Sequence, residues 1–129
     1  METITVGRTF ETPADRIRST LGDVTTFFDA AGFDVERDGD RFELQKRATV
    51  MQVELDVRLR SDESAALAYK QTSGPFEAMA TRYRVDPVSP GSRLTIETSF
   101  EPPTTGVGAT LGTAMVERQR RTELDAVAS

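Results

Sequence analysis

Hydrophobic and polar residues alternate over residues 3–10 and along most of residues 33–100, and this two-residue period is typical of half-buried β-strands. The alternation is clearest over residues 50–60, where one face is aliphatic and the other is mostly charged. The same period predicts further strands at 3–10, 33–37, 41–46, 65–71, 76–85 and 93–100. Short polar turns at 38–40, 61–63 and 87–91 separate several of them. We therefore expect about seven antiparallel strands, mostly joined in chain order.

Two short helices are predicted between the first two strands. Thr12 is placed to be an N-cap, because a proline follows it and an aspartate stands at the capping-box position three residues on. Asp23 is placed to cap a second helix over 24–31, and Gly32 is a natural C-cap for it. The two helices should form a V.

A long amphipathic helix is predicted at 105–127. On a helical wheel one stripe carries Val107, Leu111, Ala114, Met115, Arg118 and Thr122, and the opposite side carries Thr113, Glu117 and Arg120. We expect the first stripe to face the sheet. The first half of this helix is rich in glycine, and each glycine weakens an isolated helix by about 1 kcal/mol relative to alanine.

These elements predict a single α+β domain over residues 1–129: a curved antiparallel sheet of about seven strands, with the long helix packed on its concave face. Successive connections of a meander alternate between the two ends of the sheet. The turns at 38–40, 61–63 and 88–91 fall at one end, and the less regular connections at 47–49, 72–75 and 101–105, together with the two short helices, fall at the other. We place the mouth of a cavity at this second end.

The predicted cavity lies between the sheet and the long helix. From the sheet it would be lined by Phe42, Met51, Tyr69, Met79, Tyr83 and Phe100, and from the helix by Leu111, Met115 and Arg118. A mostly apolar pocket with a few polar groups is typical of small-molecule recognition. The alternative is that these side chains meet and fill the space.

Composition excludes several kinds of chemistry. The chain has no histidine and no cysteine, which excludes Ser/His/Asp and Cys/His catalysis, disulfides and the usual zinc sites. We expect no metal and no cofactor. A net charge of −5 argues against nucleic-acid binding through a broad basic surface.

The sequence also bears on location. No apolar run approaches the roughly 18 residues of a membrane span, and the N-terminus has no secretory signal, so we expect a cytoplasmic protein without integral membrane association. Lysine is scarce, at Lys46 and Lys70 alone, and acidic residues are abundant. That balance is typical of salt-adapted microbes, and GC-rich codon usage is the alternative explanation.

Four polar side chains fall on otherwise apolar faces. Arg8 and Arg118 could bind a carboxylate or enolate oxygen of a ligand, or could form a salt bridge or reach past the cavity rim. Tyr69 and Tyr83 could orient a ligand or donate a proton, or could be core residues with satisfied hydroxyls.

Three segments carry a resemblance to a known family: residues 4–17, Leu21-Gly22-Asp23 between the two short helices, and the glycine-containing start of the last helix at 106–112. Together they resemble the START/Bet v 1-like superfamily, also called SRPBCC, and especially its small polyketide cyclase/dehydrase-like members. A tryptophan common in the family is missing, and Arg18 stands near its place. The resemblance covers the whole chain in element order. It implies a helix-grip fold and hydrophobic-ligand binding, and it carries no shared catalytic motif.

Three functions remain open at this point. The first is binding or transport of a hydrophobic or amphipathic small molecule, lipid-like or polyketide-like, in an internal cavity. The second is a cyclase/dehydrase-type enzyme acting on a polyketide-like substrate. The third is a protein-interaction module, such as a chaperone activator or a lipid-delivery factor, with a protein partner or a second copy of the chain.

Overall fold

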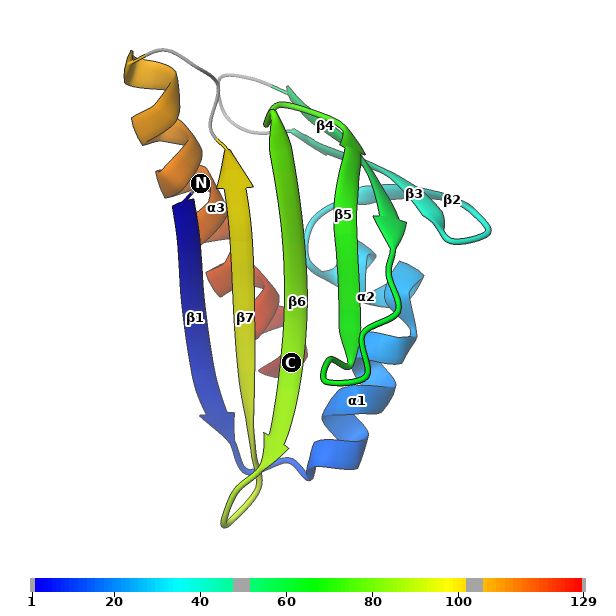
Figure 1. Cartoon of the computed structure of the whole chain (residues 1–129). Helices are drawn as coiled ribbons and strands as arrows, with labels where there is room; N and C mark the ends of the chain where they lie inside the picture. Colours follow the sequence, from blue (N-terminus) through cyan, green and yellow to red (C-terminus); the bar gives the residue numbers. More distant parts are fainter. Residues whose placement is uncertain (1, 48–51, 102–105, 129) are drawn as a thin grey trace.

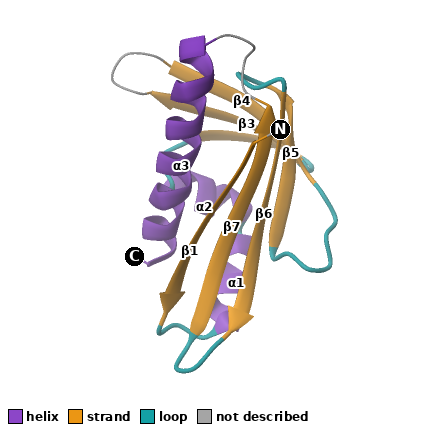
Figure 2. Ribbon diagram, turned by 60° about the vertical axis from the view of Figure 1, so that its left-hand side comes forward, coloured by secondary structure: helices purple, strands orange, loops and turns teal. Residues whose placement is uncertain are grey.

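In the part of the chain that the computed structural model describes, residues 2–47, 52–101 and 106–128, seven strands form one sheet and three helices lie on one of its faces (Figures 1 and 2). Of residues 47, 52 and 106–112 the backbone alone is described. The strands are β1 (Glu2–Phe10), β2 (Asp34–Asp38), β3 (Arg41–Arg47), β4 (Gln52–Leu59), β5 (Leu67–Ser73), β6 (Ala78–Pro87) and β7 (Ser92–Glu101). The helices are α1 (Ala14–Gly22), α2 (Val24–Ala30) and α3 (Gly106–Ala128).

The sheet is antiparallel throughout, in the order β1-β7-β6-β5-β4-β3-β2. Six strands follow one another as a meander, and β1 joins its far edge by pairing with β7, from Glu2 with Phe100 to Phe10 with Ser92. A register shift at Asp56 marks a bulge where β4 meets β5, and such bulges bend a sheet. The predicted α+β architecture, with two helices after the first strand and a long last helix, is confirmed.

The start of α1 differs from the prediction, whereas the start of α2 agrees with it. The N-cap of α1 is Pro13 without a side-chain capping bond, so the predicted cap at Thr12 is wrong. The reason lies in the sheet, because the carbonyl of Thr12 accepts a hydrogen bond from the Ser92 hydroxyl at 2.7 Å and is held at the first residue of β7. Asp23 does cap α2, since its carboxylate accepts from the backbone N–H of Thr26 at 3.5 Å.

Two glycines occupy left-handed backbone conformations that other residues rarely adopt. The C-cap of α2 is Ala31, one position earlier than the predicted Gly32, and Gly32 follows it with φ of 98°. Gly39 has φ of 63° in the hairpin turn between β2 and β3, as expected for a tight turn there. These glycines fix where α2 ends and where the meander first reverses.

The two short helices cross the sheet instead of gathering at the predicted mouth. α1 begins at the same end as the turn between β6 and β7 (Figure 1). Beside it, Arg18 donates to the carbonyl of Val85 at 3.0 Å. Phe33, three residues after the end of α2, lines the cavity described below. The prediction that both helices lie at the cavity end is therefore wrong for α1.

The face of α3 that meets the sheet also differs from the prediction. Val116, Arg120, Glu123 and Leu124 are buried, whereas Arg118 is exposed. The buried residues follow an i, i+4, i+7, i+8 spacing, which is the correct period for one helical face. The predicted stripe was chosen on hydrophobicity and therefore placed the buried Arg120 on the outside.

An aromatic cluster fills the space between α2 and the sheet. The ring of Phe28 meets Phe33, Phe42 and Tyr69 edge to face, with centroids 6.0, 5.6 and 5.5 Å away. This is a favourable geometry for aromatic pairs. The cluster forms one wall behind the cavity and holds β3 and β5 at a fixed distance from α2.

Candidate functional site

A cavity of about 150 Å³ lies between α3 and the inner face of the sheet, and we call it the α3 cavity. Its apolar lining comes from Phe33, Val53, Leu55, Pro75, Phe76, Met79, Met115 and Val116, and its polar lining from Lys46, Tyr69, Arg118, Gln119 and Arg120. An apolar cavity of about 150 Å³ is large enough for a single aromatic ring. It lies at the end of the sheet where β3 is followed by β4 and β5 by β6, which is the predicted end.

A second hollow, of about 220 Å³, lies on the outer face of the sheet. Its wall includes the ion pair between Arg82 and Glu97, whose nitrogen and oxygen are 3.0 Å apart. Arginine, aspartate, glutamate and serine side chains contribute much of its lining. The α3 cavity, unlike this hollow, has the mostly apolar walls that are typical of small-molecule sites.

The sequence named ten candidate site residues, and the structure distributes them over several places. Tyr69, Met79, Met115 and Arg118 line the α3 cavity. Phe42, Tyr83 and Phe100 are fully buried in the core and do not belong to its lining. Met51 and the side chain of Leu111 lie outside the described residues.

Arg8 lies apart from the α3 cavity, on the inner side of the edge strand β1. Its guanidinium is 2.8 Å from the carboxylate of Asp125 near the C-terminus of α3, and it lies 6.0 Å from the ring centre of Phe10. The observed partner matches the salt-bridge interpretation of this arginine. The pair joins the edge strand to the last helix.

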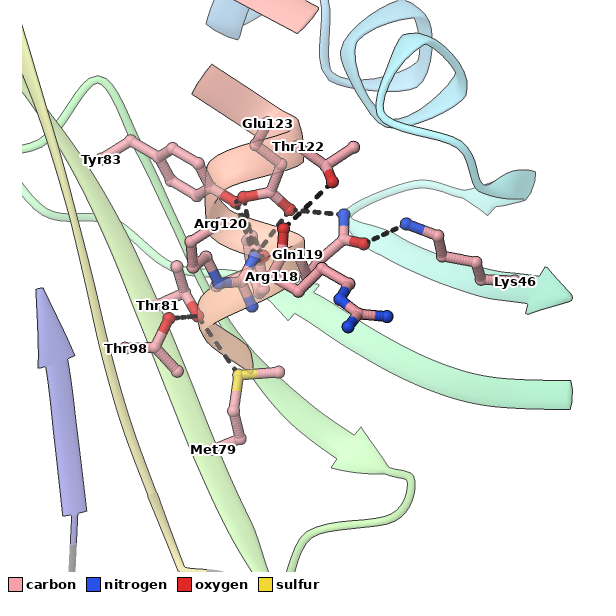
Figure 3. A network of polar contacts seen from close by, with 11 residues as sticks. Lys46, Met79, Thr81, Tyr83, Thr98, Arg118, Gln119, Arg120, Thr122 and Glu123 are labelled. Carbon is pink, nitrogen blue, oxygen red and sulfur yellow. Dashed lines mark hydrogen bonds and ion pairs between the residues drawn. The ribbon is translucent and has the colours of Figure 1, made fainter. Parts of the chain in front are cut away.

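The centre of the site is a buried ion pair within α3. One terminal nitrogen of Arg120, Nη1, is 2.8 Å from Oε1 and 2.7 Å from Oε2 of Glu123 (Figure 3). The Arg120 side chain is 5% exposed and that of Glu123 is 0% exposed, so water does not screen the pair. A buried charge requires such a partner, because its desolvation is otherwise very costly.

Two tyrosines from neighbouring strands complete this network. Tyr83 donates its hydroxyl proton to Glu123 at 2.6 Å, and Arg120 donates to the Tyr69 oxygen at 2.8 Å. The two hydroxyl oxygens are 2.9 Å apart. Since Tyr83 gives its only proton to Glu123, Tyr69 must be the donor between the tyrosines. The protons therefore run in one direction, from Tyr69 through Tyr83 to Glu123.

The buried network keeps its members in definite protonation states. Burial raises the pKa of Tyr69, and burial together with the Glu123 charge raises the pKa of Tyr83 well above its ordinary value. Burial alone would lower the pKa of Arg120, but Glu123 and the two tyrosines raise it well above the ordinary value. Both tyrosines are therefore neutral and Arg120 is charged at neutral pH.

One donor of this network has no acceptor. The Nε of Arg120 is buried and finds no hydrogen-bond partner among the described residues. Arg120 also lines the α3 cavity. Because buried donors are nearly always paired in folded proteins, an orphaned one beside a cavity points to an acceptor that enters from elsewhere.

The network extends from Glu123 to the edge of the cavity. Gln119 donates to Glu123 at 3.0 Å and accepts from the Nζ of Lys46 at 2.5 Å (Figure 3). Lys46 also lies 5.6 Å from the ring centre of Phe33. Burial lowers the pKa of Lys46, the Glu123 charge opposes that effect and Arg120 adds to it. Lys46 is thus a partly buried amine on the cavity wall.

Sequence reasoning missed Lys46, Gln119, Arg120 and Glu123. For Lys46 the signal was present, because the alternation of Phe42 and Leu44 places it on the same inner face. For Arg120 and Glu123 the signal was that two opposite charges, three positions apart, share a helical face with the apolar Val116 and Leu124. Arg118, which was named, has an exposed side chain at the rim.

Two absences apply to the described residues. Among them, no group of histidine, cysteine, aspartate and glutamate side chains is arranged to hold a metal ion. None of the helices in the same part of the chain combines the length and hydrophobicity of a membrane span.

No family model matches the chain, and no curated protein matches it in sequence. Solved structures do match. The Zhui aromatase/cyclase from Streptomyces sp. R1128 has a TM-score of 0.82 and 19% identity, over 98% of this chain and 90% of that chain. The di-domain ARO/CYC BexL has a TM-score of 0.73 and 19% identity, over 98% of this chain and 45% of that chain. Ara h 8.0201 has a TM-score of 0.71 and 11% identity, over 98% of this chain and 94% of that chain. The chain therefore shares the fold of these solved structures, and this is the fold that its sequence resemblance implied.

Proposed function

We propose that this protein binds a hydrophobic or amphipathic small molecule in the α3 cavity. The observation that carries the proposal is an apolar-walled cavity lined at one side by a buried arginine with an unused donor, Arg120 Nε. The walls would remove the apolar part of a ligand from water, which stabilises a complex by about 25 cal/mol per Å² buried. A ligand oxygen would accept the hydrogen bond that Arg120 does not make within the protein.

The charge state of the network limits which oxygen fits. Arg120 is already neutralised by Glu123 at 2.7 Å, so a second full negative charge there would compete with Glu123. A carbonyl or hydroxyl oxygen would satisfy the Arg120 donor without that repulsion. The proposed ligand is therefore an aromatic or lipid-like molecule that carries a neutral oxygen at the end buried nearest Arg120.

Native mass spectrometry of gently purified protein, paired with solvent extraction, tests this proposal. We expect a discrete added mass that extracts as a lipid-like or aromatic compound. A clean mass of the bare chain at both low and high salt would contradict a stable carrier. It would favour an enzyme with a transient substrate or a partner-binding module.

A matched pair of variants tests where the ligand lies. Val53→Phe adds volume at the half-buried cavity wall, and Ala114→Phe adds a comparable ring on the exposed side of α3. We expect Val53→Phe to weaken binding of the extracted ligand by about tenfold or more, which corresponds to about 1.4 kcal/mol, and Ala114→Phe to leave it unchanged. Equal effects of the two variants would place the ligand elsewhere.

A second candidate function is a cyclase/dehydrase-type enzyme. Its support is the unused Nε donor of Arg120, whose guanidinium is held by Glu123 and Tyr69, because an oriented donor near a bound carbonyl can stabilise a developing enolate. The similar Zhui and BexL proteins are described as aromatase/cyclases. If this function holds, the double variant Arg120→Met/Glu123→Leu, which removes both charges of the buried pair together, should lose turnover of a polyketone substrate while far-UV circular dichroism shows a folded chain. A protein partner, self-association and a cytoplasmic location stay predictions.

A further inference from the structure

The α3 cavity contains a primary amine with unusual surroundings. The chain has two lysines, Lys46 on the inner face of β3 and Lys70 on the exposed outer face of β5. Lys46 lines the cavity, whereas Lys70 does not. The two side chains share one chemistry and differ in environment, so the molecule carries its own control.

The position of Lys46 is fixed by contacts on both sides. Its Nζ donates to the Gln119 side chain at 2.5 Å and stands over the ring of Phe33 at 5.6 Å. Among the described residues it forms no ion pair with a carboxylate. An amine held by one neutral amide beside an aromatic ring keeps a lone pair for a further bond when it is unprotonated.

The charged groups that face Lys46 come from α3. Burial lowers its pKa, the Arg120 charge lowers it further, and the Glu123 charge acts in the opposite direction. Arg118 also lines the cavity and adds positive charge at the rim. The share of neutral amine is therefore larger than for a solvent-exposed lysine, and desolvated lysines of this kind are the ones that attack carbonyl groups.

We propose that Lys46 captures aldehyde- or ketone-bearing ligands of the α3 cavity as an imine. The inference rests on the proposed function, since the ligand must first enter the cavity. The Nζ lone pair forms a bond to the carbonyl carbon, and a proton moves from nitrogen to the carbonyl oxygen to give a carbinolamine. The second proton of the nitrogen then moves to the hydroxyl, the carbon–oxygen bond breaks as the carbon–nitrogen double bond forms, and one molecule of water leaves. No oxidant or reductant takes part.

Reductive trapping with benzaldehyde tests the capture step. The full chain is incubated with benzaldehyde and sodium cyanoborohydride, which reduces the imine to a stable secondary amine. Each trapped molecule adds the mass of benzaldehyde less one oxygen atom. Peptide mapping then separates Lys46, Lys70 and the N-terminal amine. The Lys46→Arg and Lys70→Arg variants keep the positive charge but cannot form an imine, and far-UV circular dichroism checks that both fold.

We expect trapping at Lys46 to be at least about tenfold faster than at Lys70, because the cavity holds the aldehyde beside the Nζ of Lys46, whereas the exposed Lys70 meets it only from solution. Lys70→Arg should leave the adduct in place and Lys46→Arg should abolish it. Mapping of the unsubstituted chain decides the question even if Lys46→Arg fails to fold. Equal labelling of the two lysines, or labelling of Lys70 alone, would overturn the inference.

Benzyl alcohol separates this inference from the proposed function, since it has the same ring and cannot form an imine. Its binding is followed by saturation-transfer NMR, and an excess of it should protect Lys46 from benzaldehyde. If benzyl alcohol binds and Lys46 is not labelled faster than Lys70, the imine inference is wrong and the cavity function stands. If neither compound binds, the binding function is contradicted as well.

Discussion

Removing the carboxylate of Glu123 should destabilise the fold strongly. Glu123→Gln keeps the shape of the side chain and leaves the Arg120 charge without a counterion at a site where its side chain is 5% exposed. The substitution also disturbs the hydrogen bonds that Glu123 accepts from Tyr83 and Gln119. Breaking one partner of a buried ion pair costs about 3–5 kcal/mol. A domain of this size has a total stability of about 5–15 kcal/mol, so the loss should be plain in any unfolding curve.

Urea unfolding followed by far-UV circular dichroism measures this loss, and the chain's lack of tryptophan makes that signal preferable to fluorescence. The matched control is Glu117→Gln on the same helix. Glu117 pairs with Arg121 at 3.0 Å, but these side chains are 49% and 62% exposed. An exposed helical pair of that kind contributes about 0.3–0.5 kcal/mol. The two substitutions make the same chemical change and differ in burial.

The double variant Arg120→Met/Glu123→Leu completes the test. It removes both charges, and replacing a buried ion pair by apolar residues is often neutral or stabilising. Tyr69 and Tyr83 keep their mutual hydrogen bond. We expect the double variant to be clearly more stable than Glu123→Gln. If Glu123→Gln costs no more than Glu117→Gln, the network is open to water and the reasoning about the site is refuted.

Three further outcomes follow from contacts already described. The raised pKa of Tyr83 means that the folded state keeps its proton where the unfolded chain releases it, so its contribution to stability should be full below about pH 10 and fall above it by about 1.4 kcal/mol per pH unit. In alkaline urea titrations Tyr83→Phe should remove that contribution and leave the contribution of Tyr69, whose pKa is also raised. An unchanged slope would contradict the burial of the Tyr83 hydroxyl. A Cβ at Gly91 would overlap the carbonyl oxygen of Phe10, so Gly91→Ala should cost about 1–3 kcal/mol in the same assay, and a neutral result would show that this corner can relax. Arg8→Ala should cost about 0.2–1 kcal/mol, because Arg8 is 37% and Asp125 72% exposed, and should not change ligand affinity; lost affinity would place Arg8 at the site.

The strands could be predicted from sequence because each side of the sheet meets a different environment. In strands β6 and β7 buried and less buried residues alternate along most of the length, so the sequence shows the same two-residue period of hydrophobic and polar residues. The caps of the helices depend on more distant contacts. The cap at Asp23 depends only on a bond to the nearby Thr26, and it was predicted. Thr12 is instead held by a hydrogen bond from the distant Ser92, which the local sequence does not reveal.

The site was harder to predict because its centre is charged. A hydrophobic pattern assigns arginine and glutamate to the surface, and it cannot register that Arg120 and Glu123 neutralise each other three positions apart. The same bias hid Lys46, although its strand period points inward. Tyr69, Met79 and Met115 were found because aromatic and thioether side chains on inner faces are what a cavity wall requires.

The pairing of β1 with β7 has a consequence for how the chain acquires its structure. Strands β2 to β7 can form as successive hairpins, each from residues close in sequence, but Val6 pairs with Ile96 and has no partner strand until most of the chain exists. Such distant pairings are slow to form, because a long loop must lose conformational entropy on closing before any stabilising contact forms. During synthesis the N-terminal segment must therefore wait, unpaired, for the end of the meander to leave the ribosome. Attachment of this segment to β7 completes the sheet, on which α3, the last element of the chain, can then pack.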